Sequence, residues 1–531
     1  MTGKQLKNSI LQWAIQGKLV PQDPNDEPAS VLLEKIRAEK ARLVKEGKIK
    51  RDKKESIIYR GEDNSYYEKF ADGKVVCIDD EIPFEIPDNW CFARLGCVCD
   101  YLHRGKSPKY GVEQVLPIIA QKCNQWDKIY TDRCLFSNLS FIDKYTEEQY
   151  LQKGDIIINS TGGGTVGRTG IIEDYIFEKY PKFVADSHVT VVRGNILLTP
   201  RYIYYYLISP NIQTGIEERC SGSTNQIELG TSTVYNYLIP VPPYKEQLRI
   251  NELMQVILQK VEKYGREQEK LENLSKLLPI HLKKSILQEA IQGRLVPQEP
   301  NDEPASELLQ RIKEEKKRLV KEGKLKKKDV IDSTIFRGDD NKYFEKKGKE
   351  TVCIDEEIPF EIPDTWAWVR LSDVVQVNPK NDVQDNTLAA FIPMERIDAT
   401  YLSSFTYSER KWGDIKSGFT HFADGDVAFA KITPCFQNRK SMILKGLPNG
   451  VGAGTTELKV LRPYAETIDR EYLLFFLESS YFVEEATFKG TANQQRIISG
   501  YMENKLFPLP PLSEQRRIAE KIKESYKRIG L

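Results

Sequence analysis

Hydrophobic side chains recur along residues 242–279 at steps of three, four or seven positions. The members of this stripe are Ile250, Leu253, Ile257, Val261, Tyr264, Leu271, Leu274 and Leu278. Because these steps keep side chains on one helix face, the pattern predicts a long helix that packs against a partner helix. Pro279 is expected to interrupt this helix, and a helical pattern resumes after it until Gly293 and Pro297.

A similar stripe lies in the C-terminal residues 510–531 and consists of Ile518, Ile522, Tyr526 and Ile529. It predicts a spacer helix much shorter than the central one. Helices are also predicted at residues 4–16 and 304–323, the second with Pro304 near its first turn and Gly323 at its end.

The chain repeats itself. Residues 7–30 closely match residues 283–306, and residues 77–90 match residues 353–366. This period is far too long for a solenoid, so we interpret the chain as a duplicated unit. Each unit holds a variable region, a long helix, a shorter helix, a basic helix and a linker. The order of the parts predicts a circular arrangement, cut inside one helical spacer. Ile518 and Ile522 are then expected to pack on the central stripe or its continuation, leaving part of that stripe uncovered.

The two variable regions share a skeleton of short strands and turns, with helical patterns such as residues 200–209. We predict an α+β fold in which two domains are separated by long, antiparallel, coiled-coil-like spacer helices in a pseudo-twofold circular repeat. The expected divisions are 1–50 (N-terminal spacer and basic helices), 51–95 (linker), 96–241 (first domain), 242–326 (central long helix, short helix and basic helix), 327–371 (linker), 372–509 (second domain) and 510–531 (C-terminal spacer helix).

Composition changes this picture little. The chain is 40% hydrophobic and 29% charged, which is typical of globular proteins. Residues 1–10 do not resemble a signal peptide, and no apolar run approaches the ~20 residues of a membrane span. Nine cysteines without framework spacing favour free thiols and a cytoplasmic location, and they form no zinc signature with the four histidines. No metal site is predicted.

The net charge of +1 gives no sign of a nucleic-acid partner, but the charge is unevenly placed. Residues 31–54 and 307–328 are both rich in lysine and arginine. Solvated helices with ion pairs one turn apart explain such segments equally well.

Two motifs resemble known functional motifs, but each lacks a feature that the function requires. The glycines from Gly162 to Gly167 match a dinucleotide or phosphate-binding loop, but the sequence after them predicts a strand rather than a helix. The matching loop of the second region, residues 431–440, has no glycine. Residues 240–244 resemble the Pro-Pro-Tyr motif of amino-methyltransferases, but Val241 stands where an acceptor is required. No catalytic residues are predicted.

What remains are loops at matched positions that combine cations, amides and hydroxyls. Arginine and lysine can contact guanine O6 and N7, asparagine and glutamine can read adenine, and the rest can hold phosphates. The DNA-binding candidates of the first region are Arg104, Lys106, Ser107, Lys109, Lys122, Asn124, Gln125, Ser160, Thr161, Thr165, Arg168, Ser187, His188, Thr224, Asn225 and Gln226. Those of the second are Asn378, Lys380, Arg396, Lys431, Thr433, Gln437, Asn438, Arg439, Lys440, Asn493 and Gln494.

The sequence closely resembles the specificity subunits of type I restriction-modification systems. The resemblance rests on the paired motifs EIPDNW and EIPDTW, GDIIINSTGGGTVGR and GDVAFAKITPC, and IPVPPYKEQLRI and LPLPPLSEQRRI. It implies two target-recognition domains, each reading half of a split, asymmetric site in double-stranded DNA. It also implies that the chain is not an enzyme and holds no cofactor. The implied partners are two methyltransferase subunits, which bind S-adenosylmethionine, and through them restriction subunits that use ATP and Mg. No membrane is implied.

Two other readings stay open. A coiled-coil scaffold without DNA contact explains the helices but not two polar-loop domains on one frame. A nucleotide-binding enzyme that uses residues 162–169 explains the glycines but not the glycine-free counterpart.

Overall fold

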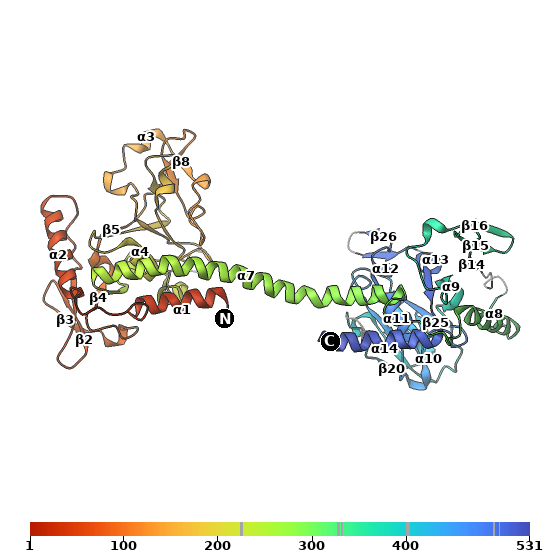
Figure 1. Cartoon of the computed structure of the whole chain (residues 1–531). Coiled ribbons are helices and arrows are strands. Elements are labelled where there is room, and N and C mark those ends of the chain that lie inside the picture. Colours follow the sequence, from red (N-terminus) through yellow and green to blue (C-terminus); the bar gives the residue numbers. More distant parts are fainter. Residues whose placement is uncertain are drawn as a thin grey trace. The chain divides into compact units, whose positions relative to one another are not determined.

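The computed structural model describes all residues except 223–226, 327–329, 331–332, 400–403, 492–493, 499 and 531. The chain divides into two compact units, Met1–Glu272 (unit 1) and Asn273–Leu531 (unit 2). Each unit contains mixed helices and strands, as the α+β prediction requires (Figure 1). One helix, α7 (Tyr244–Ile291), begins in unit 1 and ends in unit 2.

In unit 1, helix α1 (Gly3–Ile15) lies antiparallel to the first part of α7 (Figure 1). The Gly3 amide donates to Gln268 Oε1 at 2.9 Å, whereas Gln22, beyond the other end of α1, donates to Glu246 at 2.7 Å. The helices approach closely at a glycine pair, since a Cβ on Gly3 would lie 2.6 Å from Gly265 Cα.

In unit 2, helix α14 (Leu512–Arg528) lies antiparallel to the second part of α7. Its Tyr526 ring lies under Lys283 of α7, and Glu514 in its first turn accepts a hydrogen bond from Gln298, beyond the end of α7. Ile518 and Ile522 share a buried cluster with Leu287 of α7. This confirms their expected packing on the continuation of the central stripe.

Helix α7 runs through Pro279 without a break, so the expectation that this proline interrupts the helix is wrong. Proline removes one backbone donor and crowds the carbonyl one turn earlier, at a cost of ~3 kcal/mol. Tertiary packing holds the helix on both sides, because Ile250 and Leu287 are both fully buried in their units. The two anchored halves outweigh the local cost of the proline.

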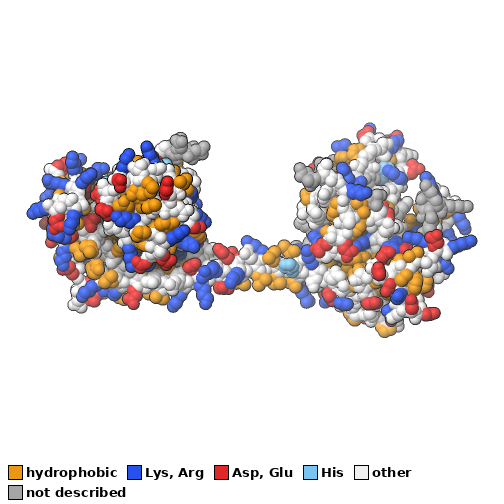
Figure 2. Space-filling model, turned by 90° about the horizontal axis from the view of Figure 1, so that it is seen from above, with side chains coloured by type: hydrophobic (Ala, Val, Ile, Leu, Met, Phe, Trp, Pro, Cys, Tyr) orange, Lys and Arg blue, Asp and Glu red, His pale blue; other side chains and the backbone are white. Residues whose placement is uncertain are grey.

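The predicted stripe divides into a covered and an uncovered part. Ile250 and Val261 are buried in the hydrophobic cluster that also contains Leu11 and Ile15 of α1. Leu271, Leu274 and Leu278 are 63%, 59% and 48% exposed, and Figure 2 shows hydrophobic side chains at the surface of this stretch. An uncovered apolar stretch on the central helix is therefore confirmed.

The variable region of unit 1 is built on two four-stranded sheets. The first has the order β10-β9-β12-β5, and the second β11-β7-β8-β6. Their strands are β5 (Cys99–Arg104), β6 (Tyr110–Gly111), β7 (Pro117–Ile119), β8 (Leu135–Ser137), β9 (Ile156–Asn159), β10 (Thr169–Ile171), β11 (Val184–Ala185) and β12 (Val189–Gly194). The helices of this domain are α3 (Leu139–Ile142), α4 (Pro200–Leu207), α5 (Pro210–Gln213) and α6 (Thr231–Tyr235).

Unit 2 repeats this plan. Its sheets have the orders β18-β25-β22-β23 and β20-β19-β24-β21. Their strands are β18 (Val375–Val377), β19 (Leu388–Ile392), β20 (Ser408–Lys411), β21 (Thr420–Ala423), β22 (Val427–Ala430), β23 (Ser441–Ile443), β24 (Val451–Gly454) and β25 (Leu458–Pro463). A hairpin follows, β26 (Phe488–Thr491) and β27 (Gln494–Ile497). The helices are α9 (Leu371–Val374), α10 (Trp412–Ile415), α11 (Arg470–Glu478), α12 (Ser480–Val483) and α13 (Tyr501–Asn504).

The segments expected as linkers contain ordered sheets. After basic helix α2 (Ala29–Lys45) come three antiparallel strands, β1 (Ser56–Arg60), β2 (Tyr66–Phe70) and β3 (Val75–Cys77). After α8 (Ala305–Lys321) come their counterparts, β14 (Ser333–Arg337), β15 (Tyr343–Lys347) and β16 (Glu350–Cys353). One short antiparallel pair then encloses each variable region, β4 (Cys91–Arg94) with β13 (Leu238–Val241) in unit 1 and β17 (Ala367–Arg370) with β28 (Leu506–Leu509) in unit 2.

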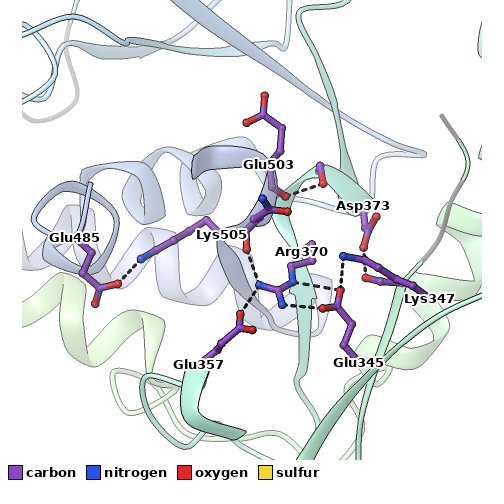
Figure 3. Close-up of polar contacts among 11 residues, drawn as sticks. Glu345, Lys347, Glu357, Arg370, Asp373, Glu485, Glu503 and Lys505 are labelled. Atoms are coloured by element: carbon purple, nitrogen blue, oxygen red, sulfur yellow. Dashed lines mark hydrogen bonds and ion pairs between the residues drawn. The ribbon is translucent and has the colours of Figure 1, made fainter. Parts of the chain in front are cut away.

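A buried arginine joins each linker sheet to the variable region of the same unit. In unit 2, Arg370 donates to Glu345 of β15 at 2.7 Å, to Glu357 at 2.9 Å and to the Asn504 carbonyl at 2.7 Å (Figure 3). Lys347 lies 3.1 Å from the second oxygen of Glu345. In unit 1, Arg94 makes the same contacts with Glu68 and Glu81.

The Arg370 cluster should make unit 2 sensitive to acid. Burial opposes ionisation of Glu345, but hydrogen bonds from Arg370 and Lys347 outweigh it and lower the pKa of this carboxyl to about 2. Its pKa in the unfolded chain is ~4.3. A depressed folded pKa stabilises the fold above about pH 4.5, and this contribution is lost as the pH falls towards 2.

We expect Glu345→Gln to lower the free energy of unfolding of unit 2 by about 3 kcal/mol at neutral pH, because it leaves a buried guanidinium partly unpaired. Between about pH 4.5 and 2, the free energy of unfolding should fall less steeply in the variant than in the wild type. Denaturant titration at several pH values measures this dependence. Glu524→Gln is the control, since Glu524 forms an exposed pair with Lys521 at 3.7 Å and should cost under about 1 kcal/mol. Equal losses in the two variants would contradict this account.

Candidate nucleic-acid interface

Loops from four strands meet at one edge of the first sheet of unit 1. Strands β5 and β9 both pair antiparallel with β12, and β10 pairs antiparallel with β9. The chain therefore leaves the sheet after Arg104 and Asn159 at the same edge where it enters before Thr169 and Val189. We call this the polar edge of unit 1. It collects the segments that contain most of the candidates of the first region.

Side chains from separate loops contact each other at this edge. Gln121 donates to the Thr161 carbonyl at 2.6 Å, and Thr161 Oγ1 lies 3.0 Å from His188 Nδ1. Arg168 donates from Nη1 to Gln125 Oε1 at 2.6 Å and from Nη2 to the Gly164 carbonyl at 3.2 Å. The sequence therefore selected loops that are neighbours in the fold.

Two of the candidates are buried. Asn124 donates from its amide to Asn159 Oδ1 at 3.1 Å and to the Arg168 carbonyl at 2.9 Å. Ser160 Oγ lies 2.6 Å from the hydroxyl of Thr190. Their side chains support the loops and are not presented at the surface.

The other described candidates of unit 1 reach the surface to different extents. Ser107, Lys109, Lys122 and His188 are exposed, whereas Arg104, Lys106, Gln125, Thr161, Thr165, Arg168 and Ser187 are half-buried. The Lys106 ammonium donates a hydrogen bond to the Lys144 carbonyl at 2.6 Å. Thr224, Asn225, Gln226 and Asn493 lie outside the described residues, as does the side chain of Gln494.

The glycine loop of residues 160–168 does not offer its amides to a phosphate. The Gly162 amide donates to the Ile227 carbonyl at 3.3 Å, and the Gly167 amide donates to the Asn159 carbonyl at 2.9 Å. The Gly164 amide faces Glu217 Oε1 at 3.4 Å. Strand β10 follows the loop, as the sequence predicted, and no helix N-terminus supports an anion there.

Unit 2 has a polar edge of the same construction, where β18 and β22 end and β23 and β25 begin. Asn378, Lys380, Arg396, Gln437 and Asn438 are exposed, and Lys431, Thr433, Arg439 and Lys440 are half-buried. Arg439 donates to the Glu478 carbonyl at 2.9 Å, and Lys440 donates to the Met394 carbonyl at 3.0 Å. Arg439 thus ties its loop to the end of α11, and Lys440 ties the same loop to the segment after β19.

Three charged residues at the polar edges were not among the candidates: Glu228 in unit 1, and Glu457 and Arg496 in unit 2. The sequence did hold a signal for them. Aligning residues 221–229 with residues 489–497 sets Glu228 opposite Arg496, an exchange of charge at one position of a shared frame.

A basic pocket of about 390 Å³ adjoins the polar edge of unit 1. One wall is the segment after α2, with Lys50, Arg51, Lys53 and Lys54, and the other includes His103 of β5 together with Thr231 and Ser232. Across the described part of the chain, no group of three or more His, Cys, Asp or Glu could hold a metal ion. None of the described helices is long and apolar enough to cross a membrane.

Comparison with known proteins identifies relatives of the chain. The specificity subunit of the type I restriction enzyme EcoAI from Escherichia coli is 45% identical over 240 residues, which are 45% of this chain and 38% of that protein. The EcoEI specificity subunit from Escherichia coli is 44% identical over 240 residues, 45% of this chain and 37% of that protein. The alignments thus cover less than two thirds of the length of these relatives.

The crystal structure of an HsdS subunit from Thermoanaerobacter tengcongensis is similar, with a TM-score of 0.44 and 17% identity over 84% of this chain and 91% of that one. The family model of the type I restriction modification DNA specificity domain matches residues 87–273 and 363–531. These two segments follow the internal repeat and make up more than half of the chain. The chain therefore belongs to the type I restriction modification DNA specificity domain family.

Proposed function

We propose that this chain is a non-catalytic specificity subunit that reads a bipartite, asymmetric DNA site and positions methyltransferase and restriction subunits on it. One observation carries the proposal: two units present a polar edge on the same frame of strands, but with different side chains. A repeated frame with unlike edges suits the reading of two unlike half-sites.

The edges have the chemistry that direct readout requires. Exposed amides and cations, such as Gln437, Asn438 and Lys380, suit hydrogen bonding to base edges in the major groove. The ties made by Arg168, Arg439 and Lys440 hold the loops in place before DNA arrives, which lowers the cost of ordering them on binding.

The basic pocket supports a contact of a different kind. Lys50, Arg51, Lys53 and Lys54 stand beside the polar edge of unit 1, where they would hold phosphates while the edge reads bases. Phosphate contacts position a protein on the duplex without selecting a sequence.

The uncovered stretch of α7 is proposed as the docking surface for a methyltransferase subunit. Leu271, Leu274 and Leu278 are about half exposed or more, and an exposed apolar patch of this kind marks a protein interface. S-adenosylmethionine, ATP and Mg would be bound by the partner subunits, and the glycine loop of this chain has its amides already occupied.

The first test is an exchange of residues 96–241 for the corresponding domain of another specificity subunit. In the assembled complex, methylation mapping should show one half-site changed and the other kept. Exchange of residues 372–509 should change the other half-site. Two changed half-sites from a single exchange would contradict the two-reader model, and titration with DNA and with ATP separates it from a scaffold or a nucleotide-binding enzyme.

The second test concerns the phosphate contacts. Lys50→Ala combined with Lys53→Ala should weaken binding to specific and unrelated DNA alike. It should reduce the slope of log K against log salt by about 2, since each lost phosphate contact removes ~0.9. Lys153→Ala combined with Lys182→Ala is the matched control, because Lys153 precedes β9 at the opposite edge of the sheet. An equal change in slope for both pairs would argue against this placement.

The third test concerns the docking stretch. Leu274→Glu combined with Leu278→Glu keeps good helix formers but places charge on the apolar face. Co-purification with the methyltransferase subunit should be lost, while circular dichroism and DNA binding by the chain stay unchanged. Val112→Glu, at a side chain that is 89% exposed and far from α7 in sequence, should not affect assembly. Normal assembly of the double variant would exclude this surface.

A further inference from the structure

Backbone hydrogen bonds fix how the two polar edges correspond. In unit 1, the Leu229 amide donates to the Ser160 carbonyl at 2.7 Å, and the Ser160 amide donates to the His188 carbonyl at 2.8 Å. In unit 2, the Ile497 amide donates to the Lys431 carbonyl at 3.0 Å, and the Lys431 amide donates to the Glu457 carbonyl at 2.8 Å. A third bond agrees, because the amides of Gly162 and Thr433 donate to the carbonyls of Ile227 and Gln495. Residue 228 of unit 1 therefore occupies the position of residue 496 in unit 2.

These two positions carry opposite charges. Residue 228 is a glutamate, and residue 496 is an arginine. Each forms an isolated β-bridge with the loop that follows the central strand, Glu228 with Thr161 and Arg496 with Ile432. The backbone is therefore the same at both positions, and only the side chain differs.

Each of the two side chains is held by a less exposed ion-pair partner. Glu228, half exposed at its side chain, lies 2.9 Å from Nη1 of Arg104, whose Nη2 donates to the Leu229 carbonyl at 2.9 Å. Arg496, also half exposed, donates from Nε and Nη2 to both oxygens of Glu457. The hydrogen bond from Arg496 lowers the pKa of Glu457, and the bond to Glu457 raises the pKa of Arg496, so both stay ionised at neutral pH.

The two ion pairs do not use every polar atom of Arg496 and Glu228. A guanidinium has five N–H donors, and the bonds of Arg496 to Glu457 use Nε and one side of Nη2. The remaining donors on Nη1 and Nη2 form a fork that matches O6 and N7 of guanine. Glu228 uses Oε1 for Arg104, and among the contacts of the described residues its Oε2 is left to accept a further bond.

We propose that residues 228 and 496 are specificity-determining residues at the same place of the two half-sites. Arg496 reads a guanine, and Glu228 accepts from the N4 amino group of a cytosine. The positive charge of Arg104 reduces the repulsion between the Glu228 carboxylate and the DNA phosphates. Glu457 orients the guanidinium of Arg496. Arg104 and Glu457 are thus positioning residues. This inference rests on the proposed function and adds which side chains read which bases.

The test uses the full chain assembled with its methyltransferase partner and selection from a pool of DNA duplexes with randomised half-sites. Arg496→Lys keeps the charge and loses the fork, so it should relax one guanine position by about 10- to 100-fold while leaving the salt dependence unchanged. Glu228→Gln should relax one cytosine position of the other half-site. Arg337→Lys, on linker strand β14, is the matched control and should leave every position unchanged.

Exchanging the charges of residues 104 and 228 tests the assignment more directly, because it should change the selected base and not only relax the selection. Arg104→Glu combined with Glu228→Arg rebuilds the ion pair in the reverse sense and should convert the selected base from cytosine to guanine at that position. Thermal melting of each variant reports whether the fold is retained. A wild-type protein without any sequence preference would overturn the proposed function itself. A specific wild-type protein whose folded Arg496→Lys and Glu228→Gln variants keep every preference would overturn only this inference.

Discussion

Each spacer helix begins with a buried carboxylate on which three segments of its unit depend. Glu246, in the first turn of α7, accepts the Trp90 indole N–H at 3.0 Å and the Gln22 amide at 2.7 Å. In unit 2, Glu514 accepts the same two bonds from a tryptophan and a glutamine at the matching positions. Burial raises the pKa of both carboxyl groups, and these hydrogen bonds oppose the shift. An unpaired buried carboxylate is costly. The start of the spacer helix, the linker with its tryptophan, and the segment that holds the glutamine must therefore assemble together.

The next residue of each spacer helix extends this constraint into the recognition domain. Gln247 accepts from the Thr199 amide at 2.9 Å, directly before α4, and Gln515 accepts from the Asp469 amide at 2.7 Å, directly before α11. The recognition domain is thus attached to the spacer by side chains of the frame that the two units share. The polar edge takes no part in these bonds, so its loops can differ between units without disturbing the attachment.

Hydrophobic periodicity and glycine or proline at element ends predicted several helices and strands from the sequence. Features that depend on packing between distant segments were missed. Strand β10 after the glycine loop and the helices α7 and α14 were foreseen, because apolar runs bounded by glycine or proline are local signals. Pro279 misled because the packing that holds α7 on either side lies far away in sequence. The linker sheets were missed because their strands are short and largely exposed. At the polar edge, one sequence cannot separate Asn124, which is buried and supports a loop, from an amide such as Gln437 that faces outwards.

The same reasoning explains how opposite charges at one matched position of the two polar edges fit the same frame. The register between Glu228 and its loop, and between Arg496 and its loop, is set by backbone hydrogen bonds that do not depend on the side chain. The side chains themselves are half exposed, and an exposed ion pair contributes only ~0–1 kcal/mol. A change of charge at this position therefore costs the fold little, whereas it reverses the hydrogen-bonding character that the edge presents. The buried carboxylates and arginines fix the shared frame, and the exposed position at residues 228 and 496 can carry either charge without disturbing it.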